Sequence, residues 1–375
     1  MSDESNQIAD SPLPPLYSAW MKDLLQGDIP AETAAPCLNC VMCPQPDRLL
    51  TPDDITFDEQ LKCCTYVPEQ PNFLVGCILA HDGPALVAGK SSTEARLQRG
   101  LGVSPFGIER SAEERHKFDE MIKGDRFGRD LDFRCPHFIV QEGGICAIWQ
   151  YRNAACTIFF CRYVRGDVGA SFWTTIKLLL GAAEDAVAQW CVSRLDLGNE
   201  ALFRLYAMKT ISPEDPTADE SIRRCSWGPW WGREREFYVE CGRLVSTLRW
   251  GDILEIGGIK LRILAGLAVQ AYRQLVEPTI PATLRFGNFS AVSLGGFSVR
   301  VWGTRRYQPI DLPPQFLQAP LLVEEGPTAE VLANTWTRTG FNITPELLRQ
   351  LLDLGILLPG FESEEAKPAN AKDCL

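Results

Sequence analysis

The sequence predicts an α+β protein that is mainly α-helical. Apolar residues recur at helical spacing over residues 170–210 and again over 221–285, which predicts long amphipathic helices. Apolar and polar residues alternate over 286–310 around a Gly-Gly pair, which predicts a β-hairpin. Residues 37–165 combine cysteines, glycines and prolines with little periodicity, a composition typical of a loop-rich module.

Changes in composition divide the chain into five predicted parts. Prolines break the first part, although Leu16 to Leu25 is expected to form a short helix. In the second part, Ser111 and Glu114 have capping-box spacing, which predicts a helix from Ser111 to Lys123. The parts are an extended leader over 1–36, a cysteine-cluster domain over 37–169, a helical region over 170–285, a winged-helix-like module over 286–360 and a disordered tail over 361–375.

The composition narrows the classes of function. The 375 residues carry a net charge of −11, which argues against nucleic-acid binding because phosphate contacts require a basic surface. The N-terminus is polar and acidic, unlike a secretion signal, and no stretch approaches the roughly 18 apolar residues of a membrane span. We therefore expect a cytoplasmic protein with no membrane or nucleic-acid partner. Thiols stay reduced in that compartment, so the fourteen cysteines favour metal binding or thiol chemistry over disulfides.

The strongest motif is the run Cys37, Cys40 and Cys43, in which two residues separate successive cysteines. This spacing lets one tight turn direct several thiolates at a common centre, as in cubane iron–sulfur sites. The pair Cys63-Cys64 follows. Adjacent side chains point in opposite directions along a strand, so one centre takes both cysteines only where the backbone turns.

A second set of cysteines lies further along the chain. Gly143-Gly144 is expected to form the turn of a hairpin that brings two of them together. Nine thiols suffice for two four-ligand centres and a spare, or for one cluster and a structural zinc. We predict one or two iron–sulfur clusters of the 4Fe-4S type, with zinc as the alternative because both metals select thiolates. The predicted cofactor and metal ligands are Cys37, Cys40, Cys43, Cys63, Cys64, Cys135, Cys146, Cys156 and Cys161.

Together these cysteines and Arg152 resemble the zinc- or iron-chelating CxxCxxCC cysteine-cluster family, which is YkgJ-like, over about residues 37–165. More distantly, they are similar to the iron–sulfur lysine methylases that act on flagellin. Asn153 and Thr157 stand where that family has proline and arginine. The resemblance implies a metal centre held by thiolates.

Other residues near the cysteines have simpler interpretations. Arg152 and Arg165 are expected to offset the charge of an anionic cluster. His137 lies two residues after Cys135, and we interpret it as a core or surface histidine rather than a ligand. Cys77 lies in an apolar stretch that we interpret as a strand with a buried, inert thiol.

The segment 313–358 is expected to form two helices joined by a turn, with Thr344 as an N-cap. With the preceding hairpin it resembles a winged helix, and also peptide-recognition domains of the PqqD type. Six acids against two arginines over 311–358 argue against DNA, so a peptide or protein partner is expected. The predicted function is a redox or peptide- or protein-modifying enzyme that uses an iron–sulfur cluster. The alternative is a non-catalytic adaptor in which zinc or a cluster is structural; no catalytic residue is predicted.

Overall fold

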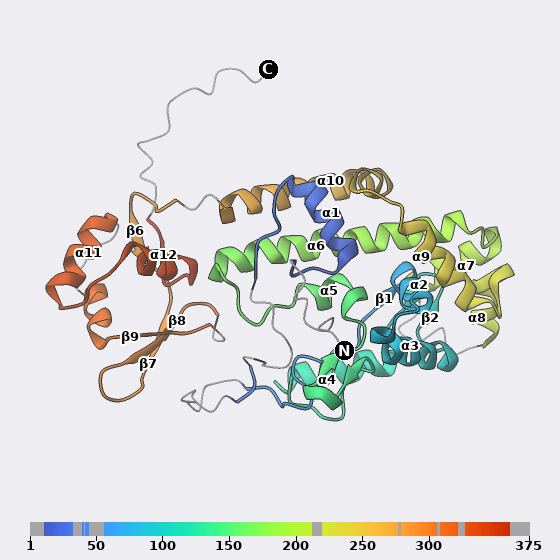
Figure 1. Cartoon of the computed structure of the whole chain (residues 1–375), viewed down its shortest axis with the longest axis horizontal. Coiled ribbons are helices and arrows are strands. Elements are labelled where there is room, and N and C mark those ends of the chain that lie inside the picture. The colour runs from blue at the N-terminus through green and yellow to red at the C-terminus, as the bar shows by residue number, and fades with distance from the viewer. Residues whose placement is uncertain are drawn as a thin grey trace, which may run out of the picture. The chain divides into compact units, whose positions relative to one another are not determined.

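The computed structural model describes residues 11–32, 40, 42–44, 56–211, 220–276, 279–305, 308–321 and 327–360. Residues 1–10 and 33–36 of the predicted leader and the predicted tail over 361–375 lie outside these residues, as does Cys37. The structure mixes helices with short strands and is mainly helical, as predicted (Figure 1). It divides into a larger unit, residues 1–161 and 172–272, and a smaller unit, residues 162–171 and 273–375.

The larger unit is built from helices, with short strands inserted between them. Its α-helices are α1 (Pro15–Leu25), α2 (Asn72–Ala80), α3 (Val87–Arg99), α4 (Ala112–Lys123), α5 (Ala154–Thr157), α7 (Asn199–Ile211), α8 (Glu220–Trp227) and α9 (Glu234–Val245), together with most of α6 (Gly166–Arg194) and α10 (Trp250–Val276). Its strands are β1 (Gln70–Pro71), β2 (Val103–Ser104), β3 (Gly107–Ile108), β4 (Phe138–Ile139) and β5 (Ile145–Cys146). The 3₁₀ turns are Pro84–Leu86, Gln141–Gly143, Trp149–Tyr151 and Gly228–Trp230.

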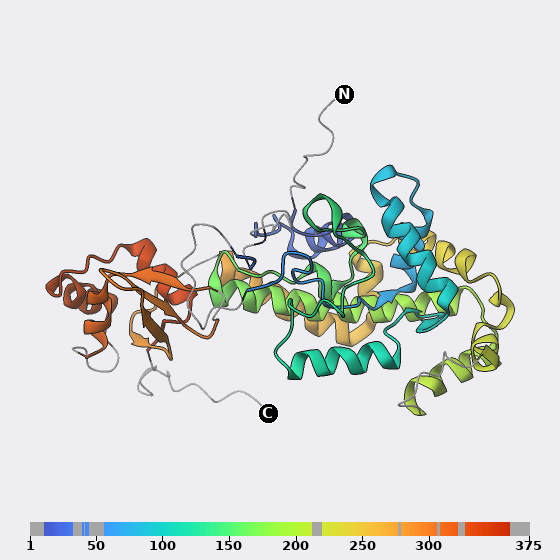
Figure 2. The same ribbon diagram turned by 90° about the horizontal axis from the view of Figure 1, so that it is seen from below.

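Helices α6 and α10 form the framework of the larger unit and run antiparallel, side by side in both ribbon views (Figures 1 and 2). The ring of Phe172, near the start of α6, packs 6.1 Å from that of Tyr272, near the end of α10. Apolar side chains at helical spacing along α6, among them Ile176 and Val187, are fully buried, as the periodicity predicts. Gly258 has φ of 60° and breaks the regular course of α10.

Helix α2 is buried along most of its length and packs against α9. The backbones approach so closely that a Cβ on Gly76 would lie 1.7 Å from the Tyr238 carbonyl oxygen. The strand predicted around Cys77 is therefore wrong, because these residues form α2. An apolar run without polar punctuation has the same pattern in a buried helix and in a buried strand, so periodicity alone could not separate them.

Local signals in the cysteine-rich region predicted two elements correctly. Ser111 caps α4, and its hydroxyl accepts a hydrogen bond from the Glu114 peptide N–H. The Glu114 carboxylate in turn accepts a hydrogen bond from the Ser111 peptide N–H. The turn at Gly143-Gly144 connects β4 to β5, which pair antiparallel with Phe138 opposite Cys146. The remaining short sheet has the strand order β1-β3-β2.

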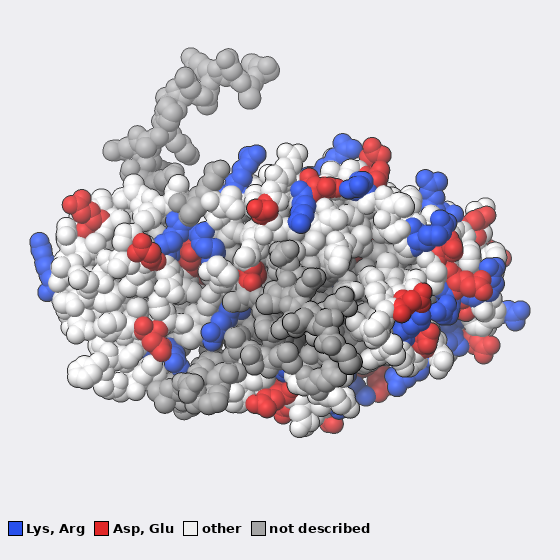
Figure 3. All heavy atoms as spheres, viewed as in Figure 1, with Lys and Arg blue, Asp and Glu red and all other residues white. Residues whose placement is uncertain are grey.

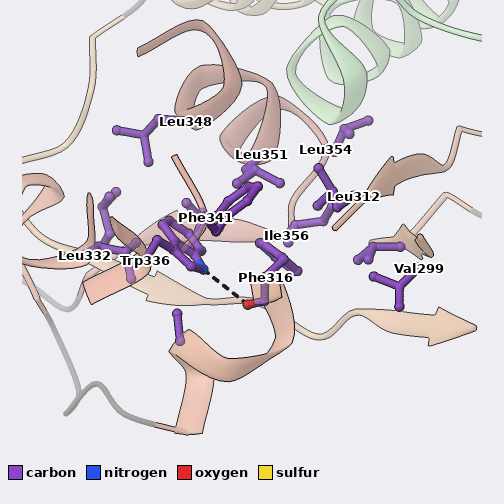
Figure 4. Close-up of a cluster of buried hydrophobic side chains, with 14 residues drawn as sticks. Val299, Leu312, Phe316, Leu332, Trp336, Phe341, Leu348, Leu351, Leu354 and Ile356 are labelled. Carbon is purple, nitrogen blue, oxygen red and sulfur yellow. Dashed lines mark hydrogen bonds between the residues drawn. The ribbon is translucent and has the colours of Figure 1, made fainter. Parts of the chain in front are cut away.

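The smaller unit surrounds its own apolar core. Its antiparallel sheets have the orders β7-β8-β9 and β10-β6, and the predicted hairpin turns at Gly295 and Gly296. Trp336 lies at the centre of the core, where its indole N–H donates to the Phe316 carbonyl at 3.1 Å (Figure 4). Its elements are β6 (Leu284–Phe286), β7 (Ser290–Ser293), β8 (Val299–Trp302), β9 (Ile310–Leu312), the 3₁₀ helix Pro314–Leu321, α11 (Ala329–Arg338), α12 (Pro345–Asp353) and β10 (Leu357–Pro359).

A buried ion pair ties the short segment 162–171 into the smaller unit. The Arg165 guanidinium donates to both carboxylate oxygens of Asp353, at 2.5 and 2.9 Å, and also to the Leu275 carbonyl at 2.6 Å. A bidentate pair of this kind fixes geometry as well as charge. Arg165 thus holds α12 through Asp353.

Charged side chains of both signs alternate over α7, α8 and α9 (Figure 3). Several pair within one helix, such as Arg204 with Glu200 and Arg243 with Glu240. This intermixing gives the exposed helices no one-sided charge. Among the described helices, none is long and apolar enough to cross a membrane.

The close contact between α2 and α9 generates a stability prediction. Gly76→Ala should destabilise the protein by about 3 kcal/mol, because the new methyl group overlaps the backbone of α9. Gly266→Ala is the matched control, since a Cβ there meets no atom within 4 Å in α10. That control should gain about 0.5 to 1 kcal/mol from higher helix propensity. Urea unfolding of both variants measures the difference, and equal stabilities would contradict this packing.

Candidate metal centre

A first group of thiols consists of Cys40, Cys43 and Cys161. The Cys43 peptide N–H donates to the Cys40 carbonyl at 3.0 Å, which closes the tight turn that the spacing predicts. The Cys40 thiol is hydrogen-bonded to the thiols of both Cys43 and Cys161. Met42 and Phe57 pack around this group and bury it.

A second group consists of Cys63, Cys64, Cys135, Cys146 and Cys156. The Cys135 peptide N–H donates to the Cys64 carbonyl at 2.7 Å, so the Cys-Cys pair lies against the start of the β4–β5 hairpin. Cys146 raises the pKa of Cys135 electrostatically, and both of them raise the pKa of Cys156. Three segments that are distant in sequence therefore bring their cysteines to one place.

Cys63 connects the two groups. Its thiol is hydrogen-bonded to that of Cys64 and interacts electrostatically with Cys40. Lys62 has φ of 53°, so the backbone turns immediately before the pair. That both cysteines serve one centre stays a prediction.

Backbone N–H groups point at several of the sulfurs with a common spacing. The donors belong to Met42 for Cys40, His137 for Cys135 and Ile148 for Cys146, each two residues after its cysteine. Such bonds favour the thiolate over the thiol. The same local conformation is thus repeated at three cysteines from both groups.

Within each group one thiol ionises more readily than its neighbours. The hydrogen bond from Cys161 lowers the pKa of Cys40 to about 6, and that from Cys64 lowers the pKa of Cys63. Burial raises the pKa of Cys43 to about 12 and that of Cys135 to about 12. Thiols with raised pKa values stay protonated at neutral pH unless a cation displaces the protons.

The rest of the second group follows the same pattern. Burial raises the pKa of Cys146, and it raises that of Cys156 well above the ordinary value. The hydrogen bond to Cys63, followed by burial, raises the pKa of Cys64. These thiols therefore stay protonated at neutral pH.

Positively charged side chains from three parts of the chain face these thiols. Arg152 acts on Cys63, Cys146 and Cys156, lowering their pKa values. Arg96, from α3, lies near Cys135. Sequence reasoning missed Arg96 because it stands about thirty residues from the nearest predicted ligand.

Lys62 is a further residue that the sequence did not single out. Its ammonium group donates to the Gly143 carbonyl and, at 3.1 Å, to the Gly144 carbonyl. It also acts on Cys43, whose pKa it lowers against the effect of burial. Lys62 therefore joins the hairpin turn to the Cys-Cys pair and faces the first group of thiols.

Asn153 and Thr157, the two residues that differ from the family that the motif resembles, stabilise the turn that carries Cys156. Asn153 caps α5, its side-chain oxygen accepting the Cys156 peptide N–H at 3.0 Å, while its amide donates to the Glu69 carbonyl at 2.9 Å. The Thr157 hydroxyl donates to the Arg152 carbonyl at 3.2 Å. Both residues hold the cysteine-bearing turn in place.

Glu184 anchors the same turn from α6. Its carboxylate accepts the Ala154 peptide N–H at 2.7 Å and the hydroxyl proton of Tyr17. The side chain is buried, and burial raises the pKa of Glu184 to about 7. No sequence motif marks this residue, because its function depends on two partners far along the chain.

His137 is a core histidine, in agreement with the preferred interpretation. Its ring is buried and its Nδ1 lies 2.7 Å from the Ser92 hydroxyl. Burial lowers the pKa of His137 to about 3, so the imidazole is neutral. Its peptide N–H, rather than its ring, is directed at a thiol.

The thiols lie near one another, but in the described structure they do not meet at a single point. Within the described residues, no three cysteine, histidine or carboxylate side chains are arranged to hold a metal ion. The described cysteines form no disulfide with one another, and Cys37 lies outside the described part. The donor set still fits a soft metal, because it consists of buried and half-buried thiols with N–H donors and cations beside them. The assignment of these cysteines as ligands stays a prediction.

Comparison with known proteins adds no relative. The sequence matches no protein-family model, no curated protein and no solved structure. The resemblance to the cysteine-cluster family therefore depends on the motif residues themselves.

Titration of Glu184 generates a prediction about stability. In the folded protein the carboxyl group of Glu184 has a pKa of about 7, against an ordinary value of 4.5. The resulting stabilisation is complete below pH 4.5 and is lost as the pH rises through 7, since the unfolded chain releases the proton first. Between pH 5 and 8 the free energy of unfolding of the wild type should fall by about 2 to 3 kcal/mol more than that of Glu184→Gln.

Urea unfolding across this pH range measures the difference. Glu200→Gln, at an exposed position on α7, is the matched control and should keep the wild-type profile. Parallel profiles for the wild type and Glu184→Gln would contradict the assigned shift.

Proposed function

We propose that this protein binds an iron–sulfur cluster through its two groups of cysteines. The observation that carries the proposal is the network of described thiols, which comes from five separate segments and meets at Cys63. Burying so many thiols together is unfavourable for their ionisation, and a bound cationic centre removes that cost. The cytoplasmic location expected from the sequence belongs to the same proposal.

The residues around the thiols have definable tasks in such a site. Cys40, Cys43 and Cys161 would hold the centre on one side, with Cys37 as the fourth member of the predicted set. Cys64, Cys135, Cys146 and Cys156 would form the second set, leaving Cys63 between them. The N–H donors and Arg152 would stabilise the thiolates, and the apolar packing would exclude water.

A cluster held here would supply electron transfer, or Lewis-acid chemistry if one iron kept an open position. We infer that the protein uses it in a redox reaction or in the modification of a peptide or protein. A structural zinc site in a non-catalytic adaptor is the competing proposal, because buried thiolates with N–H donors suit both metals.

Anaerobic purification separates the two. The proposal predicts a brown protein with broad absorption near roughly 400 nm and acid-labile sulfide. Cys40→Ser and Cys146→Ser should each lose most of the colour and bound iron, because they remove one thiol from each group. Cys225→Ser is the matched control, since this exposed cysteine lies outside both groups.

A colourless protein with stoichiometric zinc would contradict the cluster and support the zinc site. Unchanged metal content in both Cys40→Ser and Cys146→Ser would reject the ligand assignment altogether.

For the smaller unit, we propose a winged-helix-like module that docks a peptide or protein. Two capped helices follow the β7–β8 hairpin, and Phe297 at its tip is 92% exposed. An apolar ring held in water on a hairpin tip suits contact with a partner. Native mass spectrometry of the full chain should show a bound peptide that Phe297→Ser loses; identical spectra would contradict docking at this tip.

A further inference from the structure

A third set of thiols lies outside both groups of the candidate metal centre. Cys77, Cys191 and Cys241 come from α2, α6 and α9, three helices of the larger unit. The Cys191 thiol interacts electrostatically with the thiol of Cys77 and is hydrogen-bonded to that of Cys241. None of the three is a predicted metal ligand, so this set calls for its own explanation.

Direct contacts hold the three helices against one another around these thiols. The side-chain amide of Asn72, at the start of α2, donates to the Ala188 carbonyl of α6 at 2.9 Å, and Asn72 is fully buried. Helices α2 and α9 touch beside Cys241, because a Cβ on Gly242 would lie only 2.9 Å from the peptide nitrogen of Cys77. The thiols are therefore carried by a rigid framework, with little freedom to separate.

Cys191 and Cys241 are in direct contact. Both side chains are fully buried, and the Cys191 thiol also donates to the Cys241 carbonyl, with 3.9 Å between sulfur and oxygen. Burial, followed by the hydrogen bond with Cys191, raises the pKa of the Cys241 thiol. Cys241 therefore keeps its proton at neutral pH. Cys77, by contrast, is half-buried and interacts with Cys191 electrostatically.

Two thiols in contact are the starting point of a disulfide, in which the sulfurs lie about 2 Å apart. Because the thiols of Cys191 and Cys241 already face each other, the bond requires small rotations of the side chains rather than a displacement of α6 or α9. The complete burial of both sulfurs restricts the oxidant, which must be small and uncharged to enter the packed interior. Hydrogen peroxide meets both conditions.

We propose that Cys191 and Cys241 form a redox-active dithiol, which hydrogen peroxide oxidises to a disulfide between α6 and α9. Peroxide first oxidises the Cys191 thiol to a sulfenic acid and is reduced to water. The Cys241 sulfur then bonds to the Cys191 sulfur, and the Cys241 proton leaves with the sulfenic hydroxyl as a second water. Two thiols thus lose two electrons to one peroxide molecule.

The disulfide would join two parts of the larger unit covalently. Glu184, whose carboxylate holds the turn of Cys156, lies two turns before Cys191 in α6. Oxidation would therefore fix this supporting segment of α6 to α9. Because the thiolate is the reactive form and burial disfavours it, we expect the pair to react more slowly than the exposed Cys225. The proposal does not require a bound metal.

Peptide mapping without reduction tests the pairing directly. The full chain is treated with hydrogen peroxide under native conditions, remaining thiols are blocked with N-ethylmaleimide, and tryptic peptides are read by mass spectrometry. We expect a peptide that links Cys191 to Cys241 and that dithiothreitol separates. Adding dithiothreitol to the oxidised protein should also lower its melting temperature by at least about 5 °C, because the link constrains the unfolded chain.

Alanine variants assign the change in melting temperature to this pair. The drop on adding dithiothreitol should be absent from Cys191→Ala and Cys241→Ala and should persist in the matched control Cys225→Ala, which removes an exposed thiol. A drop of the same size in all three variants overturns the proposal.

Three results of the peptide map would also overturn it. These are the absence of a peptide that links Cys191 to Cys241, a peptide that links Cys191 to Cys77 in its place, and equal amounts of peptides that link Cys191 to Cys241 and to Cys225. The last result would mean that the thiols pair at random after unfolding. If the alanine variants do not fold, the peptide map of the wild type decides alone.

Discussion

Buried thiols placed beside one another cannot all ionise, because each thiolate raises the cost of forming the next. This constraint governs the larger unit of the protein. Among the described cysteines, Cys40 and Cys63 release protons readily, whereas Cys135 and Cys156 retain theirs. In the proposed metal centre, a cation would take the place of these protons.

Much of the surrounding structure holds these thiols in position. Lys62 ties the Cys-Cys pair to the hairpin turn, and Asn153 caps the short helix of Cys156. Glu184 extends this support to α6, and through Tyr17 to α1. The helical framework thus reaches the loop-rich region through a few buried polar contacts, which explains how a region with so little regular structure is ordered.

The features that the sequence predicted are those fixed by neighbouring residues. The capping box of Ser111 and Glu114, the cap at Thr344 and the turn at Gly295-Gly296 depend on short stretches with specific geometric preferences. The mainly helical fold followed from periodicity. The apolar run around Cys77 was assigned to the wrong element because complete burial erases periodicity.

Long-range contacts were not predictable in this way. Lys62, Arg96 and Glu184 act through partners that are 13 to 167 residues away, so a linear pattern carries no sign of them. The cysteine spacing indicated which thiols belong together, but their division into two groups joined at Cys63 required the fold.

The most direct measurement of the central claim is alkylation of individual cysteines by iodoacetamide, read by mass spectrometry before and after metal is removed with a chelator. The account predicts that Cys40 and Cys63, the two thiols with lowered pKa values, are protected in anaerobically isolated protein and become reactive after chelation, while the exposed Cys225 reacts in both states. The same alkylation pattern before and after chelation would contradict a metal centre at these thiols.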